Sequence, residues 1–223
     1  MIKILEAGAA NYSQDKRWDD AETILFEPDK RSFCELKEQG YEVYNTALGS
    51  KSEVKTLNLT RKPELSSFFV PNMRLLARYP QKERWDIISS VDVQVQKIDD
   101  FQLDVDFIKL DTQGSELDIL IGAPNTLKNA LGLEVEVSFF EIYQGQPLFG
   151  DICRYLAGFG FEFFDFTTEY RYGRQALNRR GQLSFADALF LKPPEAVTED
   201  KIEKYMTIAK AYGKEDLAPM LKQ

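Results

Sequence analysis

The pattern of apolar and polar positions predicts strands and helices that take turns along the chain. Short β-branched or apolar runs predict strands at residues 2–7, 23–26, 41–48, 105–110, 131–139, 161–166 and 185–192. Apolar residues at helical spacing follow most of these runs, and Leu117, Leu120 and Ile121 form one such face. No helix separates the last two strands. The order predicts an α/β fold with a mainly parallel sheet and a C-terminal antiparallel strand pair.

Two further segments extend this core. Residues 54–59 and 91–98 alternate between apolar and polar positions, so they are expected to pair as an antiparallel extension. Between them, the polar and partly basic residues 73–84 are either a substrate-facing lid or a solvated connection. Pro193 and Pro194 close the predicted domain, residues 1–194. Residues 195–223 form a charged helical tail that packs on the surface or makes a homo-oligomer contact.

The stretch from residue 107 to residue 117 carries the strongest local signal for chemistry. A buried strand ends at Asp111, Gly114 supplies a turn, and Ser115 with Asp118 offers a helix N-cap. In open α/β sheets, ligands bind outside the carboxyl ends of the strands. Asp111 is therefore a candidate catalytic residue, and its alternative role is to cap the start of the helix.

The first two strands end in features typical of nucleotide binding. Gly8 opens a turn of small residues that lets a ligand approach the backbone. Glu27 closes the second strand about 20 residues later, where an acidic residue binds ribose hydroxyls. Both features have plainer interpretations: an ordinary strand-to-helix turn for Gly8, and an N-terminal helix charge for Glu27.

Two groups of charged residues allow alternative interpretations. Glu134 and Glu136 share one face of the strand at residues 131–139, so they mark an exposed edge or line a site. Glu136 is nearer the strand's end and is the preferred site candidate. The segment 168–182 is either a solvated hairpin or a contact for an anionic substrate. It contains Arg171, Arg174, Arg179 and Arg180.

The amino-acid composition excludes several classes of binding and catalytic site. The net charge of −8 argues against nucleic-acid binding, which needs clustered cations. The chain has no histidine, so His-ligated metals and Ser-His-Asp triads are excluded, and no metal site is expected. Cys34 and Cys153 are isolated, which fits a reducing compartment. No apolar run approaches the roughly 18 residues of a membrane span, so the expected location is the cytoplasm.

Several motifs resemble those of the FkbM-type methyltransferases, a family of S-adenosylmethionine-dependent enzymes. The best match is FIKLDTQGSELDILIGA, residues 107–123, which resembles the family's strand, acidic residue, glycine and helix signature. Further matches in order are FEP (26–28), TALG (46–49), VQKIDDF (95–101), EVSFFEIYQGQPLF (136–149) and ADALFLKP (186–193). The resemblance covers residues 2–194 and implies a Rossmann-like class I methyltransferase fold.

The resemblance also implies roles for individual residues. The methionine part of the cofactor would lie beside Gly8, Ala9 and Asn11. Glu27, followed by Pro28, would bind the ribose, and Ala47 and Leu48 would flank the adenine. Asp111 would lie near the methyl-bearing end, and Tyr143 and Gln146 would line the acceptor side. Glu6 stands among the cofactor contacts, at a position where the family usually has Asp.

The implied reaction is methyl transfer from S-adenosylmethionine to a hydroxyl of a sugar, glycan or other small metabolite. Without histidine, the candidate bases are Asp111 and Glu136. For a carboxylate to act as a base, burial would have to raise its pKa. The first alternative is a non-catalytic binding or assembly protein, favoured by the missing second glycine after Gly8. The second is a nicotinamide-dependent oxidoreductase, for which the full glycine motif is absent.

Overall fold

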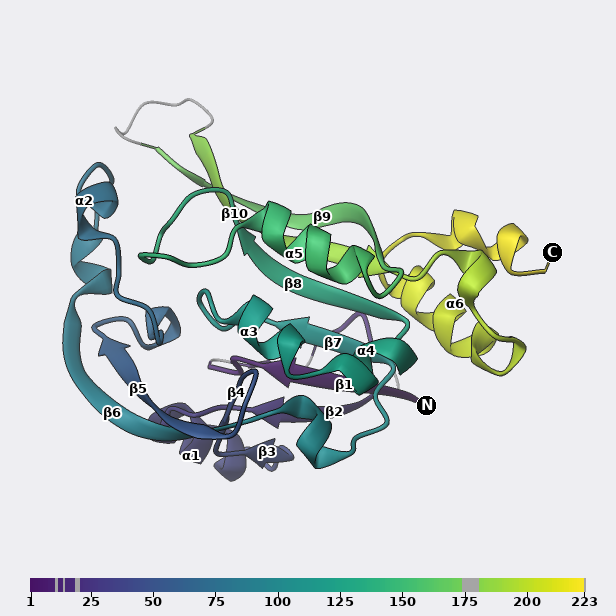
Figure 1. Cartoon of the computed structure of the whole chain (residues 1–223), viewed down its shortest axis with the longest axis horizontal. Coiled ribbons are helices and arrows are strands. Elements are labelled where there is room, and N and C mark those ends of the chain that lie inside the picture. Colours follow the sequence, from purple (N-terminus) through teal and green to yellow (C-terminus); the bar gives the residue numbers. More distant parts are fainter. Residues whose placement is uncertain (11, 14, 19–20, 174–180, 223) are drawn as a thin grey trace.

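A seven-stranded sheet forms the centre of the computed structural model, which describes residues 1–10, 12–13, 15–18, 21–173 and 181–222. Its strand order is β3-β2-β1-β7-β8-β10-β9 (Figure 1). The strands are β1 (Ile2–Ala7), β2 (Ala21–Phe26), β3 (Val43–Tyr44), β7 (Phe107–Leu110), β8 (Gly132–Ser138), β9 (Glu162–Tyr172) and β10 (Gln182–Leu191). Neighbours from β3 to β8 pair parallel, whereas β10 pairs antiparallel with both β8 and β9. The predicted α/β fold is confirmed.

Three helices cover one face of this sheet: α3 (Glu116–Ile121), α4 (Pro124–Asn129) and α5 (Phe149–Ala157). Figure 1 shows them in front of β7 and β8. Their apolar sides, represented by Leu120, Leu127 and Leu156, share one core cluster with Ile108 and Leu133 of the strands. Burial of this cluster is the main force that holds the layers together.

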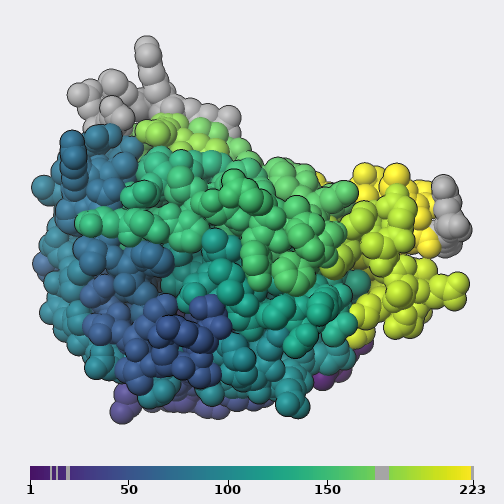
Figure 2. Space-filling view, viewed as in Figure 1, coloured from purple at the N-terminus to yellow at the C-terminus, as the bar shows by residue number. Residues whose placement is uncertain are grey.

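The opposite face of the sheet is divided between apolar and charged halves. Residues 199–222 form η5 (Glu199–Lys201), α6 (Ile202–Ala211) and η6 (Glu215–Lys222). Tyr205 of α6 is 0% exposed and shares a cluster with Ile4 and Leu191, and its hydroxyl donates to the Lys192 carbonyl at 2.8 Å. The tail therefore packs on the sheet through apolar side chains. Figure 2 shows it protruding at one end of the molecule.

A second, three-stranded sheet lies beside the first, with the order β4-β6-β5. It consists of β4 (Ala47–Leu48), β5 (Glu53–Thr60) and β6 (Ile87–Gln96), and the antiparallel pairing of β5 with β6 confirms the predicted extension. The single strand predicted at residues 41–48 is wrong. The Asn45 amide donates to the Glu27 carbonyl at 2.9 Å, and the segment divides there between β3 of one sheet and β4 of the other.

The connection between β5 and β6 contains η1 (Pro63–Leu65), α2 (Met73–Leu76) and η2 (Lys82–Trp85). Leu76 and Trp85 are buried against Ile142 and Tyr143, which follow β8. The connection is thus tied to the loop after β8. The other elements are α1 (Lys30–Glu38), η3 (Ile98–Phe101) and η4 (Pro194–Ala196). Within the described ranges, no helix has the length and apolar character required to cross a bilayer.

Candidate active site

A cavity opens at the carboxyl ends of β1, β2 and β7. It encloses about 680 Å³ of space, counting the part that is open to solvent. Six of the predicted cofactor-binding residues line it: Gly8, Glu27, Pro28, Ala47, Leu48 and Asp111. Residues that are far apart in the chain therefore meet at one cavity, hereafter the first cavity.

Gly8 allows the loops after β1 and β7 to touch. Its φ is +83°, and a Cβ built on it would lie 1.7 Å from the carbonyl oxygen of Asp111. The amide of Gly8 donates to the Phe26 carbonyl at 3.1 Å, and the amide of Asp111 donates to the Ala7 carbonyl at 3.0 Å. Only glycine fits here, because any side chain would push the two strand ends apart.

Glu27 places a buried carboxyl group in the first cavity. It is 4% exposed, and its Oε1 accepts a hydrogen bond from the Asp29 amide at 2.7 Å. Burial raises the pKa of Glu27 to about 7, although backbone hydrogen bonds from Asp29 and Ala10 oppose this change. A carboxylate held in this way is suited to accept hydrogen bonds from a ligand's hydroxyl groups.

The turn between β7 and α3 is held by Glu116. Its Oε1 accepts from the Thr112 amide at 2.7 Å, and its Oε2 accepts from the Gly114 amide at 3.0 Å. Ser115 is the N-cap residue of α3, as predicted, but its side chain makes no capping hydrogen bond, and Asp118 pairs with Lys55 at 3.1 Å. The Ser115 hydroxyl is buried beside the first cavity and has no partner among the described residues.

Asp111 and Glu136, the two candidate bases, lie side by side. Asp111 is exposed at the end of β7, and Glu136 is half-buried in β8. The Gln113 amide nitrogen donates to Asp111 Oδ1 and to Glu136 Oε2, both at 2.7 Å. Burial and the neighbouring Asp111 charge raise the pKa of Glu136 well above its usual value.

A second cavity, of about 1,090 Å³ including solvent-open space, adjoins the first. Both are lined by Gly8, Ala10 and Asp111. The lining of the second cavity is acidic and includes Glu6, Asp15, Asp111, Glu134, Glu136 and Asp187. Burial and the Asp111 charge raise the pKa of Asp187 to about 7. In the described part of the chain, no group of three or more His, Cys, Asp or Glu side chains has a metal-binding arrangement.

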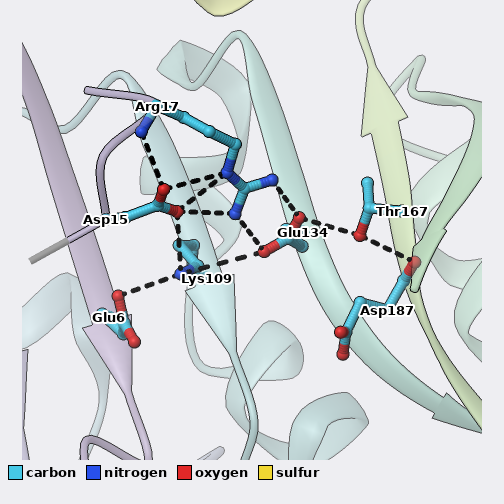
Figure 3. A network of polar contacts seen from close by, with 7 residues as sticks. All are labelled: Glu6, Asp15, Arg17, Lys109, Glu134, Thr167 and Asp187. Carbon is cyan, nitrogen blue, oxygen red and sulfur yellow. Dashed lines mark hydrogen bonds and ion pairs between the residues drawn. The ribbon is translucent and has the colours of Figure 1, made fainter. Parts of the chain in front are cut away.

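A lysine and an arginine compensate part of this acidic surface (Figure 3). Lys109 Nζ lies 3.3 Å from Glu6, 3.6 Å from Asp15 and 3.8 Å from Glu134. Arg17 makes a bidentate contact with Glu134 at 3.0 and 3.1 Å. Glu134 lies in an interior strand of the sheet and not at an exposed edge. Its carboxylate is tolerated there because these cations and a 3.0 Å hydrogen bond from Thr167 satisfy it.

The remaining predicted site residues lie elsewhere. Glu6 and Glu136 line the second cavity. Ala9 is buried in a cluster with Leu25 and lines neither cavity, whereas its neighbour Ala10 lines both. Asn11 is outside the described residues, as are Arg174, Arg179 and Arg180. Arg171 pairs with Glu169 at 2.9 Å within its own strand.

Tyr143 and Gln146 lie behind the carboxyl pair. Tyr143 is 2% exposed, and its hydroxyl lies 2.9 Å from Gln113 Oε1 and 2.9 Å from the Leu65 carbonyl. Gln146 Oε1 accepts from the Tyr143 amide at 2.6 Å. Neither residue is part of the described lining of the two cavities. Their assignment to acceptor binding stays a prediction.

Sequence reasoning missed two parts of the site. Pro63, Ser66 and Phe68, from the connection between β5 and β6, line the first cavity. The predicted lid, residues 73–84, lies just downstream of them. Gln113 was also missed, although its position inside the Asp111–Gly114 turn of the matched signature was an available signal.

The fold and the site together define a class of protein. A parallel sheet with a reversed penultimate strand, a glycine turn after β1 and acidic residues closing β2 and β7 are typical of Rossmann-like methyltransferases. Residues 6–163, well over half of the chain, match the methyltransferase FkbM domain. The chain belongs to the FkbM methyltransferase family. A comparison with curated proteins gave no match.

Proposed function

We propose that the protein transfers a methyl group from S-adenosylmethionine to a hydroxyl group of a sugar, glycan or other small metabolite. The observation that carries the proposal is the first cavity, where the buried carboxyl group of Glu27 and the Gly8 turn meet Asp111. The family supports methyl transfer in general. The cofactor and the acceptor are inferred from the chemistry of the two cavities.

The lining of the first cavity fits the parts of S-adenosylmethionine. Glu27 would accept hydrogen bonds from the ribose hydroxyls, and Leu48 and Ile119 would contact the adenine. The buried Ser115 hydroxyl offers a hydrogen bond to a polar group of the ligand. The bound cofactor supplies a methyl group on a positively charged sulfur, so positioning and exclusion of water are the main tasks of the protein.

The second cavity is the proposed acceptor side, because it meets the first at Asp111. A hydroxyl oxygen that gains a methyl group must lose its proton, and a carboxylate with a raised pKa, such as that of Glu136, is a better base for that proton. Asp111 and Glu136 are the proposed bases. Tyr143 is hydrogen-bonded to Gln113 through its hydroxyl group, and Gln146 accepts a hydrogen bond from the Tyr143 amide. Through these contacts, both residues would stabilise the acceptor side.

Isothermal titration calorimetry with S-adenosylmethionine and S-adenosylhomocysteine tests the cofactor site. Glu27→Ala should weaken binding by roughly 1–3 kcal/mol, because it removes the acceptor of the ribose hydrogen bonds. Glu35→Ala, which removes an exposed carboxylate from α1, is the matched control and should leave the affinity unchanged. NADH should not bind.

The pH dependence of this binding gives a second readout. Because the pKa of Glu27 is about 7, the carboxylate becomes protonated as the pH falls from 8 to 6. The affinity of the native protein should therefore weaken over this range, and that of Glu27→Ala should not. Absence of binding by both sulfur compounds would reject the proposal. Binding without turnover of any hydroxylated acceptor would favour a non-catalytic binding protein.

A further inference from the structure

Gln113 lies at the junction of the two candidate bases and the buried Tyr143. It follows Asp111 in the turn between β7 and α3, and its φ is +55°, a left-handed conformation that is uncommon for a residue other than glycine. Its carbonyl accepts a hydrogen bond from the buried Ser67 hydroxyl at 2.6 Å. The connection between β5 and β6 thus holds the backbone of Gln113 in place.

The side-chain amide of Gln113 uses all of its polar atoms. Its nitrogen donates one N–H to Asp111 Oδ1 and the other to Glu136 Oε2, both at 2.7 Å. Its oxygen lies 2.9 Å from the Tyr143 hydroxyl. The two acidic neighbours determine which end of the amide faces them, because an amide oxygen placed there would meet two acceptors.

We infer that Gln113 is a positioning residue that holds Asp111 and Glu136 as one acid–base pair sharing a single proton. The inference rests on the proposed function only for its role in turnover. Both carboxyl groups accept from the same Gln113 nitrogen at 2.7 Å, so their oxygens lie close together. Two adjacent negative charges repel each other, which favours retention of one proton by the pair. The two N–H groups of Gln113 then stabilise the remaining negative charge of the pair.

The surroundings also favour retention of one proton by the pair. Acidic groups outnumber basic groups among the titratable side chains around the pair, and the cations Lys109 and Arg17 are already paired with Glu6 and Glu134. The titratable side chains on the packed elements are Glu6 on β1, Lys109 on β7, Glu116 on α3, Glu134 on β8, Tyr170 and Tyr172 on β9, and Asp187 on β10. Tyr143, in the loop after β8, is a neutral neighbour, because burial and the Glu136 charge raise its pKa.

In turnover, the pair takes up the proton that the acceptor hydroxyl loses. The acceptor oxygen forms its bond to the methyl carbon, and the sulfur of the donor keeps the electron pair of the bond that breaks. The released proton goes to the ionised carboxylate, so the pair as a whole then holds two protons, one on each carboxyl group. Asp111 is exposed and returns one of them to water. No further co-reactant is needed.

Carbon-13 NMR titration of the carboxyl groups, without ligand, tests the pair directly. In the native protein, the Glu136 signal should titrate well above the ordinary glutamate range, and the Asp111 signal should respond in the same step. Gln113→Leu removes both N–H donors that stabilise the negative charge, so the midpoint of this titration step should rise by about one pH unit, a tenfold change in proton affinity. Gln102→Leu is the matched control, because Gln102 is exposed and also has a left-handed φ, +52°.

Two further variants keep the test decisive if Gln113→Leu fails to fold. Gln113→Glu has nearly the same shape and replaces the donors with an acid, so it should also raise the titration step. Asp111→Asn removes the like charge, so Glu136 should titrate in a single step at lower pH. In methyl-transfer assays, Gln113→Glu should shift the acidic limb of the kcat profile to higher pH.

Independent titration of Asp111 and Glu136 in the native protein would overturn the inference, even if the methyl donor binds. An unchanged titration in both Gln113→Leu and Gln113→Glu would also overturn it. A shared step without any binding of the sulfur compounds would reject the proposed function and leave the assignment of the pair intact. The two proposals therefore fail separately.

Discussion

At the scale of single residues, Gly8 and Gln113 show how backbone conformation positions the site. Gly8 has a φ of +83° and leaves room for the Asp111 carbonyl, so the carboxyl ends of β1 and β7 approach each other. Gln113 has a φ of +55° and directs its amide between Asp111 and Glu136. Gly8 thus positions the backbone of Asp111 and Gln113 holds its carboxylate, and Asp111 lines both cavities.

Gly8→Ala should lower the free energy of unfolding by several kcal/mol, because the clash adds to the roughly 1–2 kcal/mol cost of a left-handed non-glycine residue. Gly40→Ala is the matched control, with a φ of +88° and nothing within 4 Å of the added carbon. Urea unfolding of both variants measures the difference. Equal losses in the two variants would show that the contact with Asp111 is not restrictive.

At the scale of elements, a row of charges crosses three neighbouring strands. The register aligns Glu6 of β1 with Lys109 of β7, and Lys109 with Glu134 of β8. These side chains occupy the half of the sheet face that lies nearest the carboxyl ends of the strands. Apolar residues of α6 and η6 cover the other half. The polar half leaves room for the second cavity.

Lys109→Met should destabilise the protein by roughly 3 kcal/mol at pH 7, because it leaves the partly buried Glu6 carboxylate without its cation, whereas Asp15 and Glu134 keep Arg17. Burial already raises the pKa of Glu6 against the opposing effect of Lys109. Without Lys109 this pKa should rise further, so protonation of Glu6 should relieve the loss as the pH falls. Chemical denaturation at pH 5 and pH 8 measures this dependence.

Adding Glu6→Gln to Lys109→Met should recover part of the loss at pH 8. Lys3→Met is the control, since Lys3 pairs with Glu22 at 3.6 Å on the exposed surface and should contribute little. A loss in Lys109→Met that is independent of pH would contradict this account of the charged row.

At the scale of the whole molecule, the C-terminal tail shares the core of the sheet. Trp18 packs against Phe107 of β7 and against Tyr212, which follows α6. Trp85 lies in a separate cluster, with Tyr143. The two tryptophans therefore report on separate regions of the structure.

Tyr205→Ala should lower the free energy of unfolding by about 3–5 kcal/mol, because it removes a fully buried ring from the core under the tail. Fluorescence of Trp18 in a Trp85→Phe background, and the reverse, should give the same lowered denaturation midpoint. Thr207→Ala, on the exposed side of α6, is the control and should change little. An unchanged midpoint at Trp85 would show that the tail unfolds separately.

Several features could be predicted from the sequence because each depends on nearby residues. Apolar periodicity predicted the order of strands and helices, and the position of Asp111 followed from the end of its strand. The failures were also local. Ser115 stands at the predicted N-cap position, but its side chain makes no capping hydrogen bond; the Glu116 carboxylate accepts from the backbone amides of the turn. At Asn45, a side-chain hydrogen bond to the Glu27 carbonyl marks the break in an otherwise continuous strand pattern.

The sequence by itself determined the fold class, the family signature and the residues at the ends of β1, β2 and β7. Only the tertiary structure decided how the charges are paired. Arg17 and Glu134 are 117 positions apart, and Gln113 and Glu136 are 23 apart, so no local pattern relates them. Strand register and loop packing bring these groups within hydrogen-bonding distance. The same contacts decide which carboxylates are compensated by cations and which pair shares a proton.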